Sequence, residues 1–492
     1  MPSSFFSKLQ KPGHKPLKQE THPTHTEIRK NVSIPGRPNF THPVHLKRTV
    51  VKPRRQDTAK PKTSPKPRTQ NPRKRPGPAQ QRLESDSDEA GSDKDLLDAN
   101  KRARRSSEVE PDLKRHIRSR KAFSDEDGGK FSMIHASEIA TLSKPTKYKP
   151  AFPKDPEATE VHLQYPSASQ REKYELVVPV SNDDFKTLED IREVMEIIIS
   201  NYLPVETGAT LVNDSTGLLR RIKRAVDRLA GNEYTDHIQE WNNTLVEYRE
   251  DGTITKAIDG WKSIDLKLLE RILTQTYSRT VSPRVDDLKK YANGTDNVYG
   301  ELLPRFVSKI LKKDTLMKSD QVFVDLGSGV GNCVLQAALE VGCESWGCEM
   351  MKDACDLADL QKKEFKARCR LWGLSMGDIH LERGDFLKNE NTRKVLQRAD
   401  VVLVNNQAFT PSLNEDLTNL FLDLKEGAKV ISLKSFVPMG QKNQAKNSGA
   451  IYNILDVTEK WYYSACVSWT DAAGTYYVST KDSSRIKAVD RE

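Results

Sequence analysis

The chain has 492 residues, enough for two or three domains and for a large buried core. Only 36% of the residues are hydrophobic and 30% are charged, so either the surface is unusually charged or part of the chain does not fold. No run approaches the roughly twenty apolar residues that cross a bilayer, and the net charge of +10 favours acidic partners such as nucleic acid, chromatin or an anionic membrane surface.

The six cysteines form no CxxC pair, and all of them lie in the second half of the chain. We therefore expect neither a disulfide framework nor a zinc site. They are interpreted as buried, reduced thiols of an intracellular protein.

Residues 1–155 are predicted to be a disordered basic tail, because they are rich in Pro, Lys, Arg, Ser and Thr and show no sustained apolar period. Met1 to Arg82 holds about twenty Lys or Arg residues against about three acids. Two further basic clusters follow, Lys101–Arg105 and Lys114–Lys121. Such clusters are typical of nuclear localisation signals and of DNA or nucleosome contacts, although a solvated segment without a partner has the same composition.

Residues 156–296 are predicted to form a mainly helical lobe. A short strand at Tyr174–Val180 precedes several segments whose apolar residues recur with a helical period. These segments are Asp184–Tyr202, Thr216–Leu229, Glu233–Tyr248 and Ile264–Tyr277. We interpret their apolar stripes as core rather than as a cofactor site.

Residues 297–492 alternate between apolar strands and helices, which favours a mostly parallel, doubly wound, Rossmann-like sheet of seven strands. The predicted strands are Val322–Asp325, Ser345–Glu349, His380–Arg383, Val401–Val404 and Lys429–Leu433, then an antiparallel hairpin around Trp461–Trp469 and Tyr476–Thr480. The predicted helices are Asn332–Val341 and Met351–Trp372.

The strongest local motif is a glycine turn between the first of these strands and its helix, Asp325-Leu326-Gly327-Ser328-Gly329-Val330-Gly331-Asn332. Glycines let the backbone approach a ligand closely, and ligands of open α/β sheets bind at the carboxyl ends of the strands. The spacing is GxGxG, not the GxGxxG that holds a dinucleotide pyrophosphate. Asp325 suits the cationic methionine end of S-adenosylmethionine and would repel a pyrophosphate, which counts against a dehydrogenase.

Acids also end the next two strands. Glu349 can accept hydrogen bonds from ribose hydroxyls, and Asp385 can accept one from the adenine amino group while Phe386 packs on the base. Taken singly, each acid could merely cap a helix. Three acids at the ends of successive strands favour an S-adenosylmethionine site and therefore a class I methyltransferase.

Several motifs in order resemble one family. They are Asn297–Pro304 (NVYGELLP), the glycine turn, Val404-Asn405-Asn406 and Val467–Thr470 (VSWT). From about Leu176 to Thr480 the chain resembles the disruptor of telomeric silencing family, the histone lysine methyltransferases that lack a SET domain, and the basic tail is similar to that of fungal members.

The resemblance implies that methyl groups pass from S-adenosylmethionine to a lysine in the globular core of histone H3 within nucleosomes. It also implies a nuclear chromatin regulator that affects telomeric silencing and the DNA damage checkpoint. Ubiquitinated histone H2B would be a further partner, and DNA would be bound through the basic tail.

The resemblance assigns roles residue by residue. Asn405 is expected near the transferring methyl, Tyr299 is expected to close over the methionine end, and Phe409 and Tyr477 are expected to wall a narrow lysine channel; these four are the expected catalytic residues. The expected cofactor-binding residues are Tyr299, Gly300, Glu301, Leu302, Phe323, Val324, Asp325, Leu326, Gly327, Ser328, Gly329, Val330, Gly331, Asn332, Glu349, Asp385 and Phe386. No metal is expected.

One position departs from the family, which usually has an aromatic residue where this chain has Gln407, so the resemblance does not define the shape or polarity of the channel wall there. Methylation requires a neutral amine, and a free lysine has a pKa near 10.4. A dry, aromatic-lined channel disfavours the ammonium and lowers that pKa. Since no histidine stands out as a base, we expect catalysis by positioning and desolvation, with Asn405 orienting the amine or the cofactor.

Two alternatives remain open. A class I nucleic-acid methyltransferase fits the charge, but enzymes that modify an exocyclic base nitrogen commonly carry Asn/Asp-Pro-Pro-aromatic after the fourth strand, and this chain has Asn405-Asn406-Gln407-Ala408-Phe409. A non-enzymatic chromatin-binding protein with a degenerate core is the second alternative. The intact glycine turn, Glu349 and Asp385 argue against it.

Overall fold

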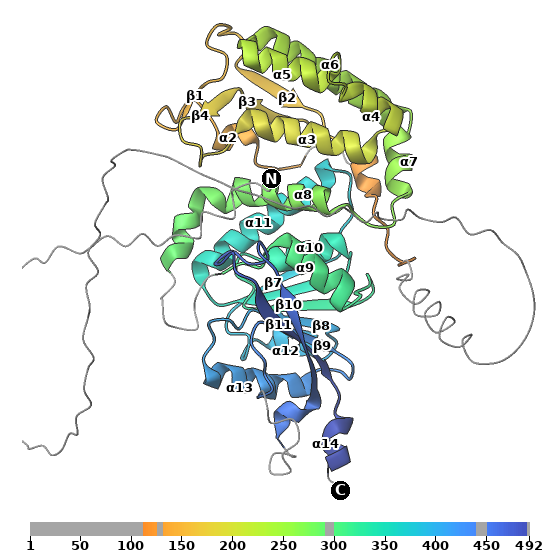
Figure 1. Cartoon of the computed structure of the whole chain (residues 1–492), viewed down its shortest axis with the longest axis vertical. Helices are drawn as coiled ribbons and strands as arrows, with labels where there is room; N and C mark the ends of the chain where they lie inside the picture. The colour runs from red at the N-terminus through yellow and green to blue at the C-terminus, as the bar shows by residue number, and fades with distance from the viewer. Residues whose placement is uncertain (1–111, 125–130, 291–299, 439–449, 490–492) are drawn as a thin grey trace, which may run out of the picture. The chain divides into compact units, whose positions relative to one another are not determined.

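The C-terminal part of the chain is built on one sheet of seven strands in the order β10-β11-β9-β8-β5-β6-β7. The structure, a computed structural model, describes residues 112–124, 131–290, 300–438 and 450–489 (Figure 1). The strands are β5 (Val322–Leu326), β6 (Glu344–Glu349), β7 (Ile379–Arg383), β8 (Val401–Val404), β9 (Lys429–Ser432), β10 (Leu455–Tyr462) and β11 (Gly474–Lys481). Strand β11 runs antiparallel to both of its neighbours, β9 and β10, and the other four strand pairs are parallel, so the predicted mostly parallel, seven-stranded sheet is confirmed.

The central strands β5 and β8 are buried along their whole length, because both faces of the sheet are covered. Phe323 points to one face and packs in a cluster with Phe306 and Tyr476. Val324 points to the other face and packs in a cluster with Phe421. From β5 the chain builds outward through β6 and β7 and then returns to place β8 on the other side. This reversal leaves a crevice at the carboxyl ends of β5 and β8.

Helices and short turns of helix surround the sheet. They are α9 (Pro304–Lys309), η4 (Ile310–Asp314), α10 (Asn332–Glu340), α11 (Lys352–Leu371), α12 (Glu390–Leu396), α13 (Pro411–Leu420), η5 (Phe421–Asp423), η7 (Ile451–Ile454) and α14 (Ser484–Val489). The predicted helices at Asn332 and Met351 are confirmed within one residue at each end, whereas α12 and α13 were not predicted from the sequence.

The helical lobe precedes the sheet. Its helices are α3 (Thr187–Tyr202), α4 (Val205–Leu211), α5 (Leu218–Arg228), α6 (Gly231–Glu250), α7 (Thr253–Asp259) and α8 (Leu266–Thr280), followed by η3 (Ser282–Lys290). Two small antiparallel sheets accompany them, one pairing β1 (Tyr148–Pro150) with β4 (Val177–Pro179) and the other pairing β2 (Glu160–Leu163) with β3 (Glu172–Glu175). The predicted strand Tyr174–Val180 is thus wrong as a single strand. Its two parts pair with different partners, and Leu176 between them bonds to Thr159 instead.

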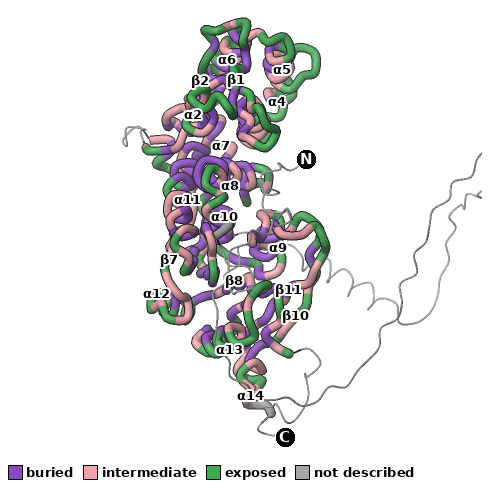
Figure 2. The backbone as a smooth tube through the Cα atoms, turned by 90° about the vertical axis from the view of Figure 1, so that its left-hand side faces the viewer, coloured by how far each residue is buried: buried purple, intermediate pink, exposed green. Residues whose placement is uncertain are grey.

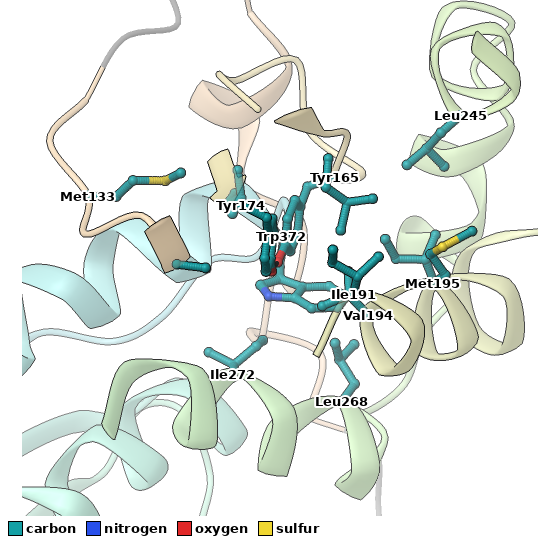
Figure 3. Close-up of a cluster of buried hydrophobic side chains, with 14 of the residues drawn as sticks. Met133, Tyr165, Tyr174, Ile191, Val194, Met195, Leu245, Leu268, Ile272 and Trp372 are labelled. Carbon is teal, nitrogen blue, oxygen red and sulfur yellow. Dashed lines mark hydrogen bonds between the residues drawn. The ribbon is translucent and has the colours of Figure 1, made fainter. Parts of the chain in front are cut away.

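The core of the lobe continues into the helices of the sheet. Trp372, directly after α11, is fully buried and packs edge-on against Tyr165 with ring centroids 5.1 Å apart (Figure 3). Its indole Nε1 donates to Gln275 of α8 at 2.9 Å. Helix α8 is buried almost throughout because it contacts both α10 and α11, and Figure 2 shows buried residues gathered along these three helices.

The predicted start of the folded part, at residue 156, is wrong. Folded elements begin with η2 (Arg120–Phe123) and α2 (Ala136–Ile139), and Ile117, Ala122 and Tyr148 are buried. The Arg115 side chain donates to the carbonyls of Leu339 and Ser375, which fastens this segment to the sheet domain. A prediction from composition misses this segment because charged residues outnumber its few apolar ones. Here, however, a charged side chain, Arg115, makes specific contacts that hold the segment in place.

The predicted closing hairpin is confirmed as antiparallel, but its first strand ends at Tyr462 and does not reach Trp469. Residues 466–468 instead bond to the segment before α9, because Leu303 N donates to Cys466 O at 2.8 Å and Ser468 N to Glu301 O at 2.9 Å. All six cysteines are free in the structure, and all but Cys466 are buried. Within the described ranges no helix is long and apolar enough to cross a membrane.

Candidate functional site

A cavity of about 370 Å³ opens where β5, β6 and β8 end. Its wall brings together the glycine turn after β5, the end of β6, the turn after β7 and the segment after β8. The lining residues are Gly300, Glu301, Leu302, Asp325, Gly327, Ser328, Gly329, Val330, Asn332, Cys333, Glu349, Met350, Met351, Asp385, Phe386, Leu387, Leu403, Asn405, Phe409 and Leu413. The cavity therefore lies at the edge of the sheet where the sequence predicted a ligand site.

The glycine turn forms one side of this cavity. Gly327 and Gly331 have φ of +82° and +88°, values that residues with a Cβ rarely adopt. Gly327 N donates to Cys348 O at 2.9 Å, which ties the turn to the end of β6, and Gly331 caps the start of α10. These conformations bring the backbone against the cavity without a side chain between them.

Asp325 is the most unusual acid of the site. It is only 4% exposed, and within the described residues its carboxylate contacts no cation. Burial, with a smaller contribution from the charge of Glu349, raises the pKa of Asp325 to about 8. A buried carboxyl group without a counter-charge favours the approach of a positively charged ligand, which would restore its ionised form.

Glu349 is held in place by backbone donors. Its Oε2 accepts from Gly329 N at 2.9 Å, and its Oε1 accepts from Met350 N and Met351 N at 2.8 Å each. A carboxylate offers about four lone-pair sites, so little capacity is left for the two ribose hydroxyls that the sequence assigned to it. Its clearest observed effect is to fix the glycine turn against the end of β6.

Glu301 belongs to a short segment that closes another side of the cavity. Its Oε1 accepts from Asn332 Nδ2 at 3.0 Å, and its backbone N–H donates to Ser468 Oγ at 2.9 Å. Burial and the charge of Glu301 raise the pKa of Tyr277 on α8 well above its usual value. Gly300 lies against Trp469, where a Cβ would come within 2.7 Å of the indole ring. The segment 300–303 is therefore clamped from both sides.

The two asparagines after β8 differ in their bonding. Asn406 is fully buried and fully engaged, since its Oδ1 accepts from Leu433 N and Lys434 N and its Nδ2 donates to Asn414 Oδ1 and Lys434 O. Asn405 Nδ2 donates to Gly300 O at 3.0 Å, but its buried Oδ1 has no partner within the described residues. Asn406 is thus structural, while Asn405 offers a free acceptor beside the cavity.

A second cavity of about 470 Å³ lies on the other side of the segment after β8. Asn405 and Phe409 line the first cavity, whereas Gln407 lines the second together with Tyr477 and Tyr462. Phe409 also stacks on Phe386, with ring centroids 6.3 Å apart and planes inclined by 28°. The segment after β8 therefore presents Asn405 and Phe409 to the first cavity and Gln407 to the second.

Most of the predicted cofactor residues lie on the first cavity, but four do not. Phe323, Val324 and Leu326 are buried in the two cores of the sheet, because successive strand residues point to opposite faces. The fourth, Gly331, caps the start of α10. Tyr477 lies on the second cavity, and Tyr299 lies outside the described residues. Lining residues that the sequence did not suggest are Cys333, Met350, Met351, Leu387, Leu403 and Leu413. Two of these, Met350 and Leu387, directly follow a predicted acid or aromatic residue, a signal that could have found them.

The residues of the first cavity fit S-adenosylmethionine. Asp325 and Glu301 supply negative charge for its cationic end, and Phe386, Leu387 and Met350 supply apolar surface for a base. Asp385 already bonds to Leu387 N through Oδ1 and pairs with Lys388 at 3.1 Å. Within the described residues no group of three His, Cys, Asp or Glu side chains is arranged to hold a metal ion.

Comparison with known proteins gives a consistent result. Residues 277–481 match the family model described as "Histone methylation protein DOT1". A protein of Emericella nidulans named "Histone-lysine N-methyltransferase, H3 lysine-79 specific" is 55% identical over 388 residues, covering 79% of this chain and 77% of that protein. A protein of Aspergillus fumigatus with the same name is 48% identical over 488 residues, covering 99% of this chain and 97% of that protein.

Proposed function

The chain belongs to the DOT1 family of histone methylation proteins, and from this premise we propose that it methylates lysine 79 in the globular core of histone H3 within nucleosomes. It is a histone-lysine N-methyltransferase, and its methyl donor is S-adenosylmethionine. The observation that carries the proposal is the cavity of about 370 Å³, in which a buried, unpaired acid, a glycine turn and a free amide oxygen meet. A degenerate, non-enzymatic core would not be expected to keep this combination.

The charged residues of the cavity hold and orient the donor. Asp325 and Glu301 face its cationic end, and Glu349 keeps the glycine turn in place. Phe386 and the methionines after Glu349 pack on its base. Bound S-adenosylmethionine supplies an electrophilic methyl group on sulfonium.

The lysine approaches from the other side of the segment after β8. The second cavity is lined by Tyr477, Leu433 and Val437, with Gln407 at the position where the family usually has an aromatic residue. Contact with Tyr477, Leu433 and Val437 removes water from part of the lysine side chain, which lowers the pKa of the amine. Asn405 Oδ1, free and buried beside the first cavity, accepts a hydrogen bond from the amine and aligns its lone pair.

The basic N-terminal segment and the cellular location complete the proposal. The lysine and arginine clusters of residues 1–111, which lie outside the described residues, bind DNA phosphates and direct the chain to the nucleus. Ubiquitin on histone H2B is a further partner of the same substrate.

The proposal is tested by methyl transfer from labelled S-adenosylmethionine to reconstituted nucleosomes, free histones and naked DNA, with mass spectrometry of the products. Label on lysine 79 of histone H3, seen with nucleosomes, is the expected result. Label on DNA would favour a nucleic-acid methyltransferase, and no transfer despite measurable cofactor binding would contradict the proposed reaction.

Asn405→Ala should lower kcat about 100-fold, equivalent to about 2.7 kcal/mol of lost transition-state stabilisation, because the amine loses its acceptor. Ser468→Ala is the matched control, since it loosens the segment 300–303 from the side opposite to Asn405. This control should weaken cofactor affinity slightly and leave kcat at saturating cofactor unchanged. Full activity of Asn405→Ala with normal cofactor binding would show that the assigned role is wrong.

A further inference from the structure

Helix α5 (Leu218–Arg228) has two faces with different roles. Leu218, Ile222 and Ala225 are buried and pack toward α6, which runs beside α5 (Figure 1). Arg221 at the edge of this contact forms two bonds to Glu240 of α6, at 2.7 and 2.5 Å. The inner face is therefore fully used by the fold of the lobe.

The outer face carries a regular row of cations. Arg220, Arg224 and Arg228 recur at every fourth residue, so each lies about 6 Å further along the helix than the last, and Lys223 stands beside them. Lys223, Arg224 and Arg228 are exposed, and Figure 2 shows exposed and intermediate residues along α5. None of the four forms an ion pair within the described part of the chain.

The chemistry of this row counts against two kinds of partner. A membrane surface would need the apolar face of a basic amphipathic helix, but that face of α5 is buried in the lobe. A protein partner would normally bring an apolar centre to the interface, and the residues of the outer face are charged, with Asp227 the acid among them. A regularly spaced, polyanionic backbone needs no apolar contact, only cations at repeated intervals.

We propose that the outer face of α5 binds the phosphate backbone of duplex DNA, as a contact separate from the basic N-terminal segment. Guanidinium groups form two parallel hydrogen bonds to a phosphate, which favours a row of arginines over a diffuse lysine patch. The contact reads no base sequence and adds a salt-dependent part to the affinity. The contact positions the helical lobe on DNA. Its existence depends on the surface of α5 and not on the proposed reaction.

The test uses the full chain with Lys223, Arg224 and Arg228 all changed to Ala. The matched control removes the same charge from exposed lysines on separate elements, Lys149→Ala, Lys267→Ala and Lys394→Ala. Binding to a naked duplex of about 30 base pairs is measured by fluorescence anisotropy over a salt series, without cofactor. Each lost phosphate contact should reduce the slope of log affinity against log salt by about 0.9, so the α5 variant should lose between two and three units of slope.

At about 0.15 M salt the α5 variant should bind the duplex roughly tenfold more weakly, and the control should stay within about twofold of the parent. Arg224→Lys with Arg228→Lys keeps the charge and should keep most of the slope. Unchanged thermal stability and cofactor affinity exclude misfolding as the cause.

Equal loss of slope in the α5 variant and its control would overturn the proposal, because total charge and not position would then govern binding. A loss seen with nucleosomes but not with the naked duplex would also overturn it and would indicate an acidic protein surface. Because no step of this measurement involves methyl transfer, its failure is distinguishable from failure of the proposed reaction.

Discussion

Buried acids occur in two regions of this protein, and their surroundings differ. Where the helical lobe meets the sheet domain, Glu172 accepts from Arg279 at 2.9 Å and from Arg368 at 2.5 Å, and Asp190 pairs with Arg279 and Arg271. Burial alone would raise the pKa of Glu172, but the two guanidinium groups outweigh it and hold that pKa below its usual value.

At the cofactor cavity the balance is reversed. Asp325 is equally inaccessible, but no cation faces it within the described residues, and burial raises its pKa to about 8. In the first region every buried acid has a cation partner, whereas in the second no described residue supplies a positive charge, and a cationic ligand fits there. The partners of a buried acid, more than its burial, therefore distinguish a structural site from a binding site in this protein.

Breaking the paired region should have the largest effect. Glu172→Gln leaves Arg279 and Arg368 buried with too few acceptors, and we expect the free energy of unfolding to fall by about 3–5 kcal/mol. Because the pKa of Glu172 is depressed in the folded state, its stabilising effect is complete above pH 4.5 and is lost as the pH falls toward its folded value. Urea unfolding followed by circular dichroism measures the change. A loss below about 1 kcal/mol would show that the network is not cooperative.

Neutralising the unpaired acid should instead affect binding. Asp325→Asn should weaken S-adenosylmethionine binding about 100-fold, because the cationic end loses its counter-charge. In the parent, affinity should rise with pH up to about 8, since the ligand displaces a proton from Asp325 below that pH. The variant should show no such rise. Isothermal titration between pH 6 and 9 in buffers of different ionisation enthalpy measures both effects.

In the cofactor-free chain, Asp325 has the opposite effect: it lowers the free energy of unfolding as the pH rises. Because the folded-state pKa of Asp325 exceeds its ordinary value of 3.8, the folded chain keeps a proton that the unfolded chain releases between about pH 4 and 8. This group therefore costs stability as the pH rises through that window, and Asp325→Asn should flatten the dependence. A variant less stable than the parent at pH 8 would mean that Asp325 has a structural partner after all.

The two regions also differ in how far the sequence predicted them. Asp325 and the glycine turn lie at the end of β5, and Glu349 lies at the end of the next strand, β6, so spacing along a short stretch of sequence was enough to assemble them. The side chains of Phe323 and Val324 do not line the cavity, because residues along a strand alternate between its faces and these two point into the two cores of the sheet.

The paired region was not predicted at all. Glu172 meets Arg279 across 107 residues and Arg368 across 196, distances at which no local pattern operates. In the sequence the strand EKYE around Glu172 resembles a solvated edge. Arg279 lies beyond the predicted helix Ile264–Tyr277, and no buried contact was predicted for Arg368 in the helix Met351–Trp372. Periodicity therefore predicted the long helices and the strands of the main sheet, while the contacts between distant elements required the fold.

The smallest effect on the free energy of unfolding is expected from an ion pair that, unlike the buried pairs of Glu172, is exposed to water. Arg192 and Glu196 on α3 are 3.0 Å apart at the i, i+4 spacing, and their side chains are 52% and 43% exposed. Water screens this pair, and the cation precedes the acid, the weaker order on a helix, so Glu196→Gln should cost less than about 0.5 kcal/mol. Measured under the same urea conditions as Glu172→Gln, it isolates burial as the variable, because both changes replace a paired carboxylate with an amide of the same size. Similar losses in the two variants would mean that helix propensity or the unfolded state, and not the buried network, produces the destabilisation at the junction.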